Sequence, residues 1–215
     1  MQHSVISLLI VVLGASVAAF CAMGLRQRTR RLALAAAAAE MHLEFNSADL
    51  NDLPLRYADL ALIGSGHSRR ADNITTGRIG RWHVRVFDFR YEAGHGVGRL
   101  TQHYSAAVVD LADPMDSLLL WHKGDIKNAP LEARFGDGDA GAWTYLGSEA
   151  VAHRLAHACA PLSDLAVSAQ VERDVLLLCC PAGRGTKAYI QLMTSLGDVL
   201  AALAGHAPTA TPRTN

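Results

Sequence analysis

The sequence predicts an α+β fold, with an N-terminal helix ahead of an antiparallel meander sheet and its flanking helices. Residues 70–111 contain three consecutive strand-like segments joined by short turns. Helical periodicity is confined to segments set apart from those strands, most clearly at residues 148–159 and 186–203. Half of the 215 residues are hydrophobic and 19% are charged, which excludes a disordered or low-complexity chain.

An uncharged apolar run occupies residues 5–25. At about 1.5 Å of rise per residue, such a helix matches the hydrocarbon core of a bilayer, so we expect a transmembrane helix there. A cleaved signal peptide would need a basic segment before the run, and residues 1–4 contain no Lys or Arg. A lipidated cysteine would need a small residue before it, and Phe20 precedes Cys21.

Four arginines follow the run directly: Arg26, Arg28, Arg30 and Arg31. The positive-inside rule places such a cluster in the cytoplasm, and we expect these side chains to contact anionic lipid headgroups. Residues 26–42 contain no Gly or Pro and hold five consecutive alanines, so the helix should continue as a stiff stalk. An alternative is that the alanine stretch packs against a second stalk.

These patterns give an expected organisation in five parts. They are a short extracytoplasmic N-terminus (1–4), a transmembrane helix (5–25), a basic and Ala-rich helical stalk (26–42), a cytoplasmic α+β domain (43–205) and a flexible tail (206–215).

At the start of the domain, residues 46–54 are turn-rich and residues 55–63 are expected to form one helix. The meander follows, with strands at 71–76, 81–91 and 100–111, a turn at 77–80 and a glycine-rich loop at 94–98. The rest of the domain is expected to contain strands at 118–122 and 143–146, a loop at 123–141, a helix at 148–159 with Ser148 as N-cap, a hairpin of 165–171 with 175–180, and a helix at 186–203 ended by Gly205.

The middle strand of the meander changes its apolar phase half-way. Its apolar residues are Trp82, Val84 and Val86, then Phe87, Phe89 and Tyr91. This flip predicts either a bulge near residues 86–87 or a strand covered on different faces at its two ends. In the second case Asp88 and Arg90 would share the face of the first core and would need partners.

The segment 64–70, GSGHSRR, is the first candidate for a binding site, because small residues and arginines together can cradle a phosphate or carboxylate. It lacks the P-loop pattern, so an alternative is a simple link whose Arg69 and Arg70 pair with Asp72 or Asp88. The candidate binding residues are His67, Arg69, Arg70, Asp88 and Arg90.

Neither a metal nor a cofactor is expected. The four cysteines have no C-x-x-C spacing, and His153 and His157 lack the Glu of the H-E-x-x-H zinc motif. Lys plus Arg equals Asp plus Glu at 20 each, so no basic balance favours nucleic-acid binding.

The motif I-G-S-G-H-S-R-R-A-x-N from Ile63, together with Gly77, Gly80, the FDFRY block at 87–91, the glycine loop and Thr101, resembles the signature of a family of bacterial single-pass membrane-anchored proteins of unknown function. The resemblance covers about residues 40–125. It implies a cytoplasmic domain on a helix in the bacterial inner membrane, and it brings no activity and no catalytic residue.

Three functions are compatible with these patterns. The favoured one is a membrane-tethered interaction or regulatory module that binds another protein or a lipid headgroup through its sheet edge and polar patch. The second is a small hydrolase-like enzyme, which requires His67 or Ser68 to converge with other groups in one pocket. The third is a scaffold that associates through its stalk.

Overall fold

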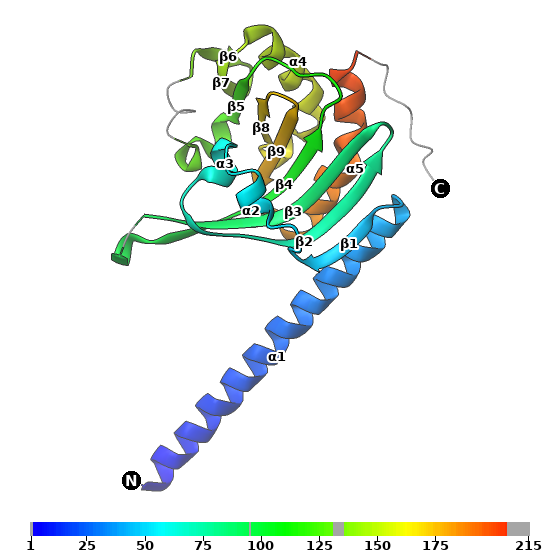
Figure 1. Cartoon of the computed structure of the whole chain (residues 1–215). Coiled ribbons are helices and arrows are strands. Elements are labelled where there is room, and N and C mark those ends of the chain that lie inside the picture. The colour runs from blue at the N-terminus through cyan, green and yellow to red at the C-terminus, as the bar shows by residue number, and fades with distance from the viewer. Residues whose placement is uncertain (1, 95, 131–135, 206–215) are drawn as a thin grey trace.

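The computed structural model describes residues 2–94, 96–130 and 136–205, without the side chains of residues 2–11, 97 and 184. The described strands form one antiparallel sheet in the order β1-β2-β3-β4-β9-β8-β5-β7-β6 (Figure 1). Their bounds in chain order are β1 Glu44–Ala48, β2 His67–Ile79, β3 Trp82–Ala93, β4 Leu100–Asp110, β5 Leu118–His122, β6 Gly138–Ala140, β7 Trp143–Gly147, β8 Ser168–Glu172 and β9 Val175–Pro181. The predicted α+β class with an antiparallel sheet is confirmed.

Helices cover the two faces of the sheet unequally. The last turns of α1 (Gln2–Glu40), together with α4 (Glu149–Cys159) and α5 (Gly185–Leu203), pack on one face and form the larger apolar core. The short helices α2 (Leu53–Arg56) and α3 (Ala61–Gly64) lie on the opposite face over a second core (Figure 1). The sheet therefore separates two cores, and the larger one contains the end of α1.

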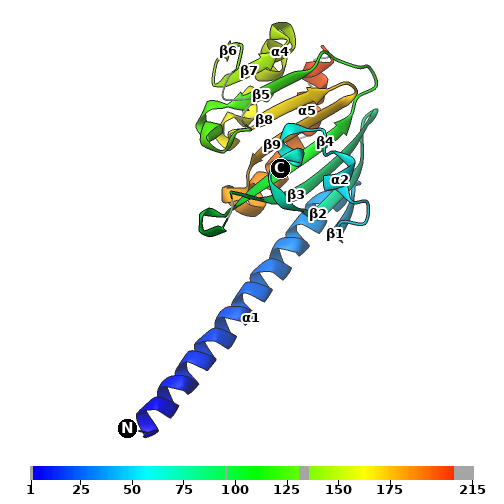
Figure 2. The same ribbon diagram turned by 60° about the vertical axis from the view of Figure 1, so that its left-hand side comes forward.

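Helix α1 runs unbroken for 39 residues and projects from the body, with the N-terminus at its far end (Figures 1 and 2). The prediction that the apolar helix continues into the stalk is confirmed. The expected boundary between stalk and domain lies near residue 42. The helix is already part of the packed body before that point, because Leu34 and Ala38 are fully buried in the larger core. One face of the alanine stretch, with Ala37 and Ala38, packs on this chain's own body, while Ala36 and Ala39 are exposed.

Among residues 2–94, 96–130 and 136–205, no helix combines the length and apolar character needed to cross a membrane. The span expected at residues 5–25 begins with residues 5–11, whose side chains lie outside the description. That span stays a prediction.

The phase change in β3 is explained by coverage on different faces at its two ends. Pairing of β3 with β4 runs without a register shift from His83↔Asp110 to Ala93↔Leu100. Val86 belongs to the larger core, while Phe87 and Phe89 belong to the smaller one. The alternative of a bulge within β3 is therefore wrong, and the second interpretation, which places Asp88 and Arg90 on the α1 side, is confirmed.

A bulge does occur on the neighbouring strand. The β2–β3 register shifts between Asp72 and Thr75, and Asn73 adopts a left-handed backbone with φ of 52°. Asn tolerates this region better than most residues because its short polar side chain can bond locally.

Two expectations near the start of the domain are wrong. The turn-rich stretch 46–54 begins inside strand β1, whose sequence EFNSA has little strand character and pairs through its backbone with β2. The single helix expected at 55–63 is two short helices, because Leu60 has an extended backbone between them. This break lets Leu53 and Tyr57 from one turn and Leu62 from the next all reach the same core.

The second half follows the predicted order closely. Strands β5 and β7, the β8–β9 hairpin and helices α4 and α5 all form, and Gly205 has the left-handed φ of 71° expected after a helix end. Ser148 stands at the N-cap of α4 but makes no side-chain capping bond. The expected loop 123–141 contains the 3-10 helix η2 (Lys123–Asn128) and strand β6. The tail 206–215 lies outside the described residues.

Candidate functional site

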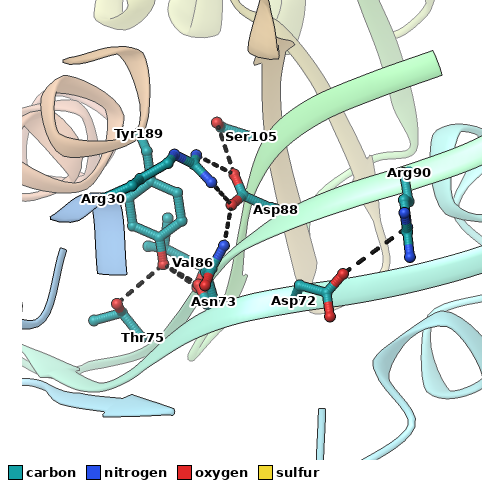
Figure 3. A network of polar contacts seen from close by, with 9 residues as sticks. All are labelled: Arg30, Asp72, Asn73, Thr75, Val86, Asp88, Arg90, Ser105 and Tyr189. Atoms are coloured by element: carbon teal, nitrogen blue, oxygen red, sulfur yellow. Dashed lines mark hydrogen bonds and ion pairs between the residues drawn. The ribbon is translucent and has the colours of Figure 1, made fainter. Parts of the chain in front are cut away.

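The bulge in β2 is closed by a tyrosine from α5. The hydroxyl of Tyr189 lies 2.7 Å from the carbonyl oxygens of both Asn73 and Val86 and 3.0 Å from the Thr75 hydroxyl oxygen (Figure 3). Tyr189 and Thr75 are fully buried. The tyrosine proton can bond one carbonyl at a time, and the Thr75 hydroxyl can donate to the tyrosine oxygen. Burial raises the pKa of Tyr189 well above its usual value, so the phenol stays protonated and acts as a structural donor.

Next to this bulge, Arg30 of α1 binds Asp88 of β3. Its two terminal nitrogens donate to the two carboxylate oxygens at 2.5 and 2.9 Å (Figure 3). The Asn73 amide donates to the same carboxylate at 2.7 Å, and the Ser105 hydroxyl lies 3.5 Å from it. The hydrogen bond to Asp88 raises the pKa of Arg30. This bidentate pair joins α1 to the sheet, and we expect it to hold the angle at which α1 leaves it.

The alternation of β3 explains why Asp88 needs such a partner. Asp88 follows Val84 and Val86 on the face covered by α1 and α5, so its carboxylate is 17% exposed. A carboxylate that loses most of its hydration requires charged or polar donors. The sequence predicted this need correctly but assigned it to Arg69 or Arg70, whereas the structure supplies Arg30.

Beside the Arg30–Asp88 pair lies a pocket of about 730 Å³, which we call the neck pocket. Its walls are one face of α1, the α1-facing side of β2, β3 and β4, and the start of α5. The residues that matter below are Arg26, Gln27, Arg30, Arg90, His103 and Gly185.

The neck pocket brings together residues from two separately predicted groups. Arg26 and Arg30 come from the arginine cluster expected at the headgroups, and Asp88 and Arg90 come from the expected binding patch. The sequence offered no reason to place these groups side by side. The spacing of four residues from Arg26 to Arg30, Leu34 and Ala38 is one signal that α1 presents a single face to the domain.

Arg28 and Arg31 do not line the neck pocket; both are exposed. By helical geometry Arg28 lies about 200° around α1 from Arg26, so it points away from the sheet.

The remaining predicted residues lie along the first part of β2. Arg70 donates to Asp72 at 3.1 Å, which confirms the predicted link to that acid, and Arg90 approaches the same carboxylate at 3.9 Å. Arg69 lies 3.4 Å from the Ile63 carbonyl oxygen and is otherwise exposed. Both arginines are thus exposed on β2, with Arg69 next to α3 and Arg70 paired with Asp72.

His67 pairs with Glu92 near the turn of the β3–β4 hairpin and does not line the neck pocket. Its Nε2 atom lies 3.6 Å from Glu92, and Arg99 pairs with the same carboxylate at 3.2 Å. Hydrogen bonding to Ser68 and the nearby positive charges lower the pKa of Glu92. Of the loop residues 94–98, His95 is outside the description, and Gly96–Gly98 form a short 3-10 helix.

No family model and no curated protein matches this chain. A solved structure, the mycobacterial trehalose monomycolate transport factor A, TtfA, has a similar fold with a TM-score of 0.55. The two chains share 14% sequence identity, and the match covers 86% of this chain and 99% of TtfA. At this identity the likeness concerns the fold, and the proposed family signature stays a prediction.

Proposed function

We propose that this chain is a membrane-tethered module whose α+β body binds a partner at the cytoplasmic face of the bacterial inner membrane. The observation that carries the proposal is the surface of α1 where it projects from the body. Its large apolar side chains are more than half exposed: Val12, Leu13, Val17, Phe20, Met23 and Leu25. A row of such side chains on a free helix needs an apolar environment, because water contact costs about 25 cal/mol per Å².

The position of the arginines supports the same arrangement. The uncharged apolar run ends at Leu25, Arg26 and Arg28 come directly after it, and Leu32 is exposed beyond them. Basic residues next to an apolar helix favour the cytoplasmic side and add about 1 kcal/mol each when they meet an anionic surface. The body then lies in the cytoplasm, held close to the membrane by the Arg30–Asp88 pair.

The fold likeness is compatible with a non-enzymatic role. TtfA is described as a transport factor, and nearly its whole length resembles this chain in fold. We therefore propose binding, and not catalysis, as the work of the body. The exposed Arg69 and Arg70 on β2 are its proposed contact with another protein.

Cysteine labelling in spheroplasts tests the tether and its orientation. Burial raises the pKa of Cys159 to about 12 and that of Cys179 well above its usual value, so these thiols should resist maleimide in the folded protein. With Cys21 changed to Ser, a reporter at Thr101→Cys should react with an impermeant maleimide only after the membrane is opened. Labelling of intact spheroplasts would place the body outside and refute the orientation, and recovery of the chain in the soluble fraction would refute the tether.

Crosslinking in intact cells tests the partner. We expect a stoichiometric adduct from the native chain that is lost in Arg69→Ala/Arg70→Ala. The matched control is Arg78→Ala/Arg81→Ala, which removes two exposed arginines at the other end of the β2–β3 hairpin. Both variants are first checked for native circular dichroism. If native chain and both variants are recovered alone, the binding role is wrong.

A further inference from the structure

The neck pocket has cationic donors that the protein itself does not use fully. Arg26 is exposed, and within the described residues no carboxylate binds it. Arg90 lies 3.9 Å from Asp72, but Arg70 already holds that carboxylate at 3.1 Å. Arg90 therefore keeps donors for an additional acceptor, since a guanidinium carries five N–H groups.

His103 adds a third donor beside Arg90. The two residues are directly opposite each other in the β3–β4 pairing, and His103 is exposed on the wall of the pocket. Arg30, by contrast, already holds both carboxylate oxygens of Asp88 and serves as part of the wall. The free donors of Arg26, Arg90 and His103 thus come from three elements that meet at one opening.

The start of α5 strengthens the preference for an anion. Gly185 lines the pocket and begins a helix of 19 residues. The N-terminal end of such a helix carries a partial positive charge, which favours a phosphate when side-chain donors are already present.

The position of the neck pocket next to the proposed membrane indicates that the phosphate comes from a lipid. Arg26 is the first residue after the apolar run and also a wall of the pocket. If residues 5–25 span the bilayer, the opening lies at the level of the lipid phosphates. A volume of about 730 Å³ accommodates a headgroup.

The lining charges favour an acidic headgroup. Three arginines line the pocket against two aspartates, which leaves one net positive charge before His103 is counted. A zwitterionic headgroup would bring its own cation close to Arg26 and Arg90, whereas an anionic one brings only the phosphate charge. We propose that the neck pocket binds the phosphate of an anionic phospholipid through Arg26, Arg90 and His103, an inference that rests on the proposed membrane tether.

Native mass spectrometry of the full chain released from nanodiscs tests this site. The discs contain equal parts of phosphatidylglycerol and phosphatidylcholine, and the readout is the ratio of the two lipids retained on the protein. We expect phosphatidylglycerol to be enriched on the native chain and the enrichment to fall about tenfold in Arg26→Gln/Arg90→Gln, because two charge-assisted contacts are lost. His103→Gln should reduce it by about threefold.

The matched control is Arg28→Gln, which removes an arginine from the opposite face of α1. We expect its enrichment to stay within about twofold of the native value. An equal loss in Arg28→Gln and in the pocket variant would show a diffuse surface charge effect and overturn the pocket. Equal retention by all variants would overturn it as well.

A second arm separates lipid from free phosphate. In discs of phosphatidylcholine alone, inorganic phosphate at matched ionic strength should leave the thermal midpoint unchanged. A stabilisation that disappears in Arg26→Gln/Arg90→Gln, with no lipid enrichment, would assign the site to free phosphate and overturn the lipid. Flotation of each variant with vesicles tests the membrane tether separately. If the chain floats but shows no preference for phosphatidylglycerol, the lipid site in the neck pocket is wrong and the tether stands. If the chain does not float, the proposed function is wrong.

Discussion

The Arg30–Asp88 pair joins a projecting helix to the sheet, and its strength can be worked out from the structure. At a charge separation of about 4 Å and an effective dielectric near 20, the attraction is about 4 kcal/mol. The side chains keep 25% and 17% of their exposure, so solvent screening and the cost of desolvation reduce this gain. We expect a net coupling free energy of about 2 kcal/mol, in the range of hydrogen bonds between charged groups.

A double-mutant cycle with Arg30→Met and Asp88→Asn measures this coupling. Asp88→Asn keeps the shape of its side chain, and Arg30→Met keeps an unbranched stem without the guanidinium, so the cycle measures the coupling of the charge pair. The assay is urea unfolding of the full chain in detergent micelles, followed by the fluorescence of the three tryptophans, of which Trp121 and Trp143 are buried and Trp82 is partly buried. Arg30→Met should be the more costly single change because it leaves a poorly hydrated carboxylate. A coupling below about 0.5 kcal/mol would show an ordinary surface pair and refute a fixed angle between helix and sheet.

Three further predictions concern single positions. Leu34→Ala should lower the free energy of unfolding by about 2–5 kcal/mol because it empties a fully buried site. Leu32→Ala, at a side chain 63% exposed, should change it by less than about 0.5 kcal/mol. Urea unfolding compares the two variants, and equal effects would contradict the packing of α1 into the core. Tyr189→Phe should lower the free energy of unfolding by about 1–3 kcal/mol because buried carbonyls lose their hydrogen-bond donor. Tyr57→Phe should lower it less, because Arg85, the partner of Tyr57, still binds Asp110. The reverse order in thermal unfolding would be evidence against this account. Burial lowers the pKa of His122, and its neutral Nδ1 accepts a hydrogen bond from the Gly124 N–H. The contribution of His122 to the free energy of unfolding should therefore be lost as pH falls below the unfolded-state pKa of 6.5 and through the lower folded-state pKa. His122→Asn should flatten that part of the profile of stability against pH.

The strands that were predicted well are those whose apolar pattern is strong. β5 was placed at its exact bounds, since LLLW is buried on both faces. The phase change in β3 also carried real information, because it required two cores and predicted partners for Asp88. An apolar pattern shows which side chains of a strand point toward a core. The faces of the neighbouring strands then follow from their pairing register.

The elements that were missed have little pattern of their own. Strand β1 is a short edge strand held by the backbone of β2, and β6 has three residues. The helix expected at 55–63 was wrong because burial of Leu60 and Leu62 on the same core overrides a continuous helical stripe. In each case the deciding interaction comes from another part of the chain, which local propensity does not contain.

The site was missed for a related reason. Arginines after an apolar helix look alike in the sequence, and only the spacing of four residues from Arg30 to Leu34 and Ala38 separates Arg30 from Arg28. The distinction appears only when the last turns of α1 are placed on the sheet by Leu34 and Ala38, which turns one face of the helix toward Asp88. Because the same helix is the proposed anchor and a wall of the larger core, a force or lipid contact near Arg26 acts directly on the sheet. A partner bound at Arg69 and Arg70 on β2 would then be positioned by the membrane through rigid elements, without any hinge between anchor and domain.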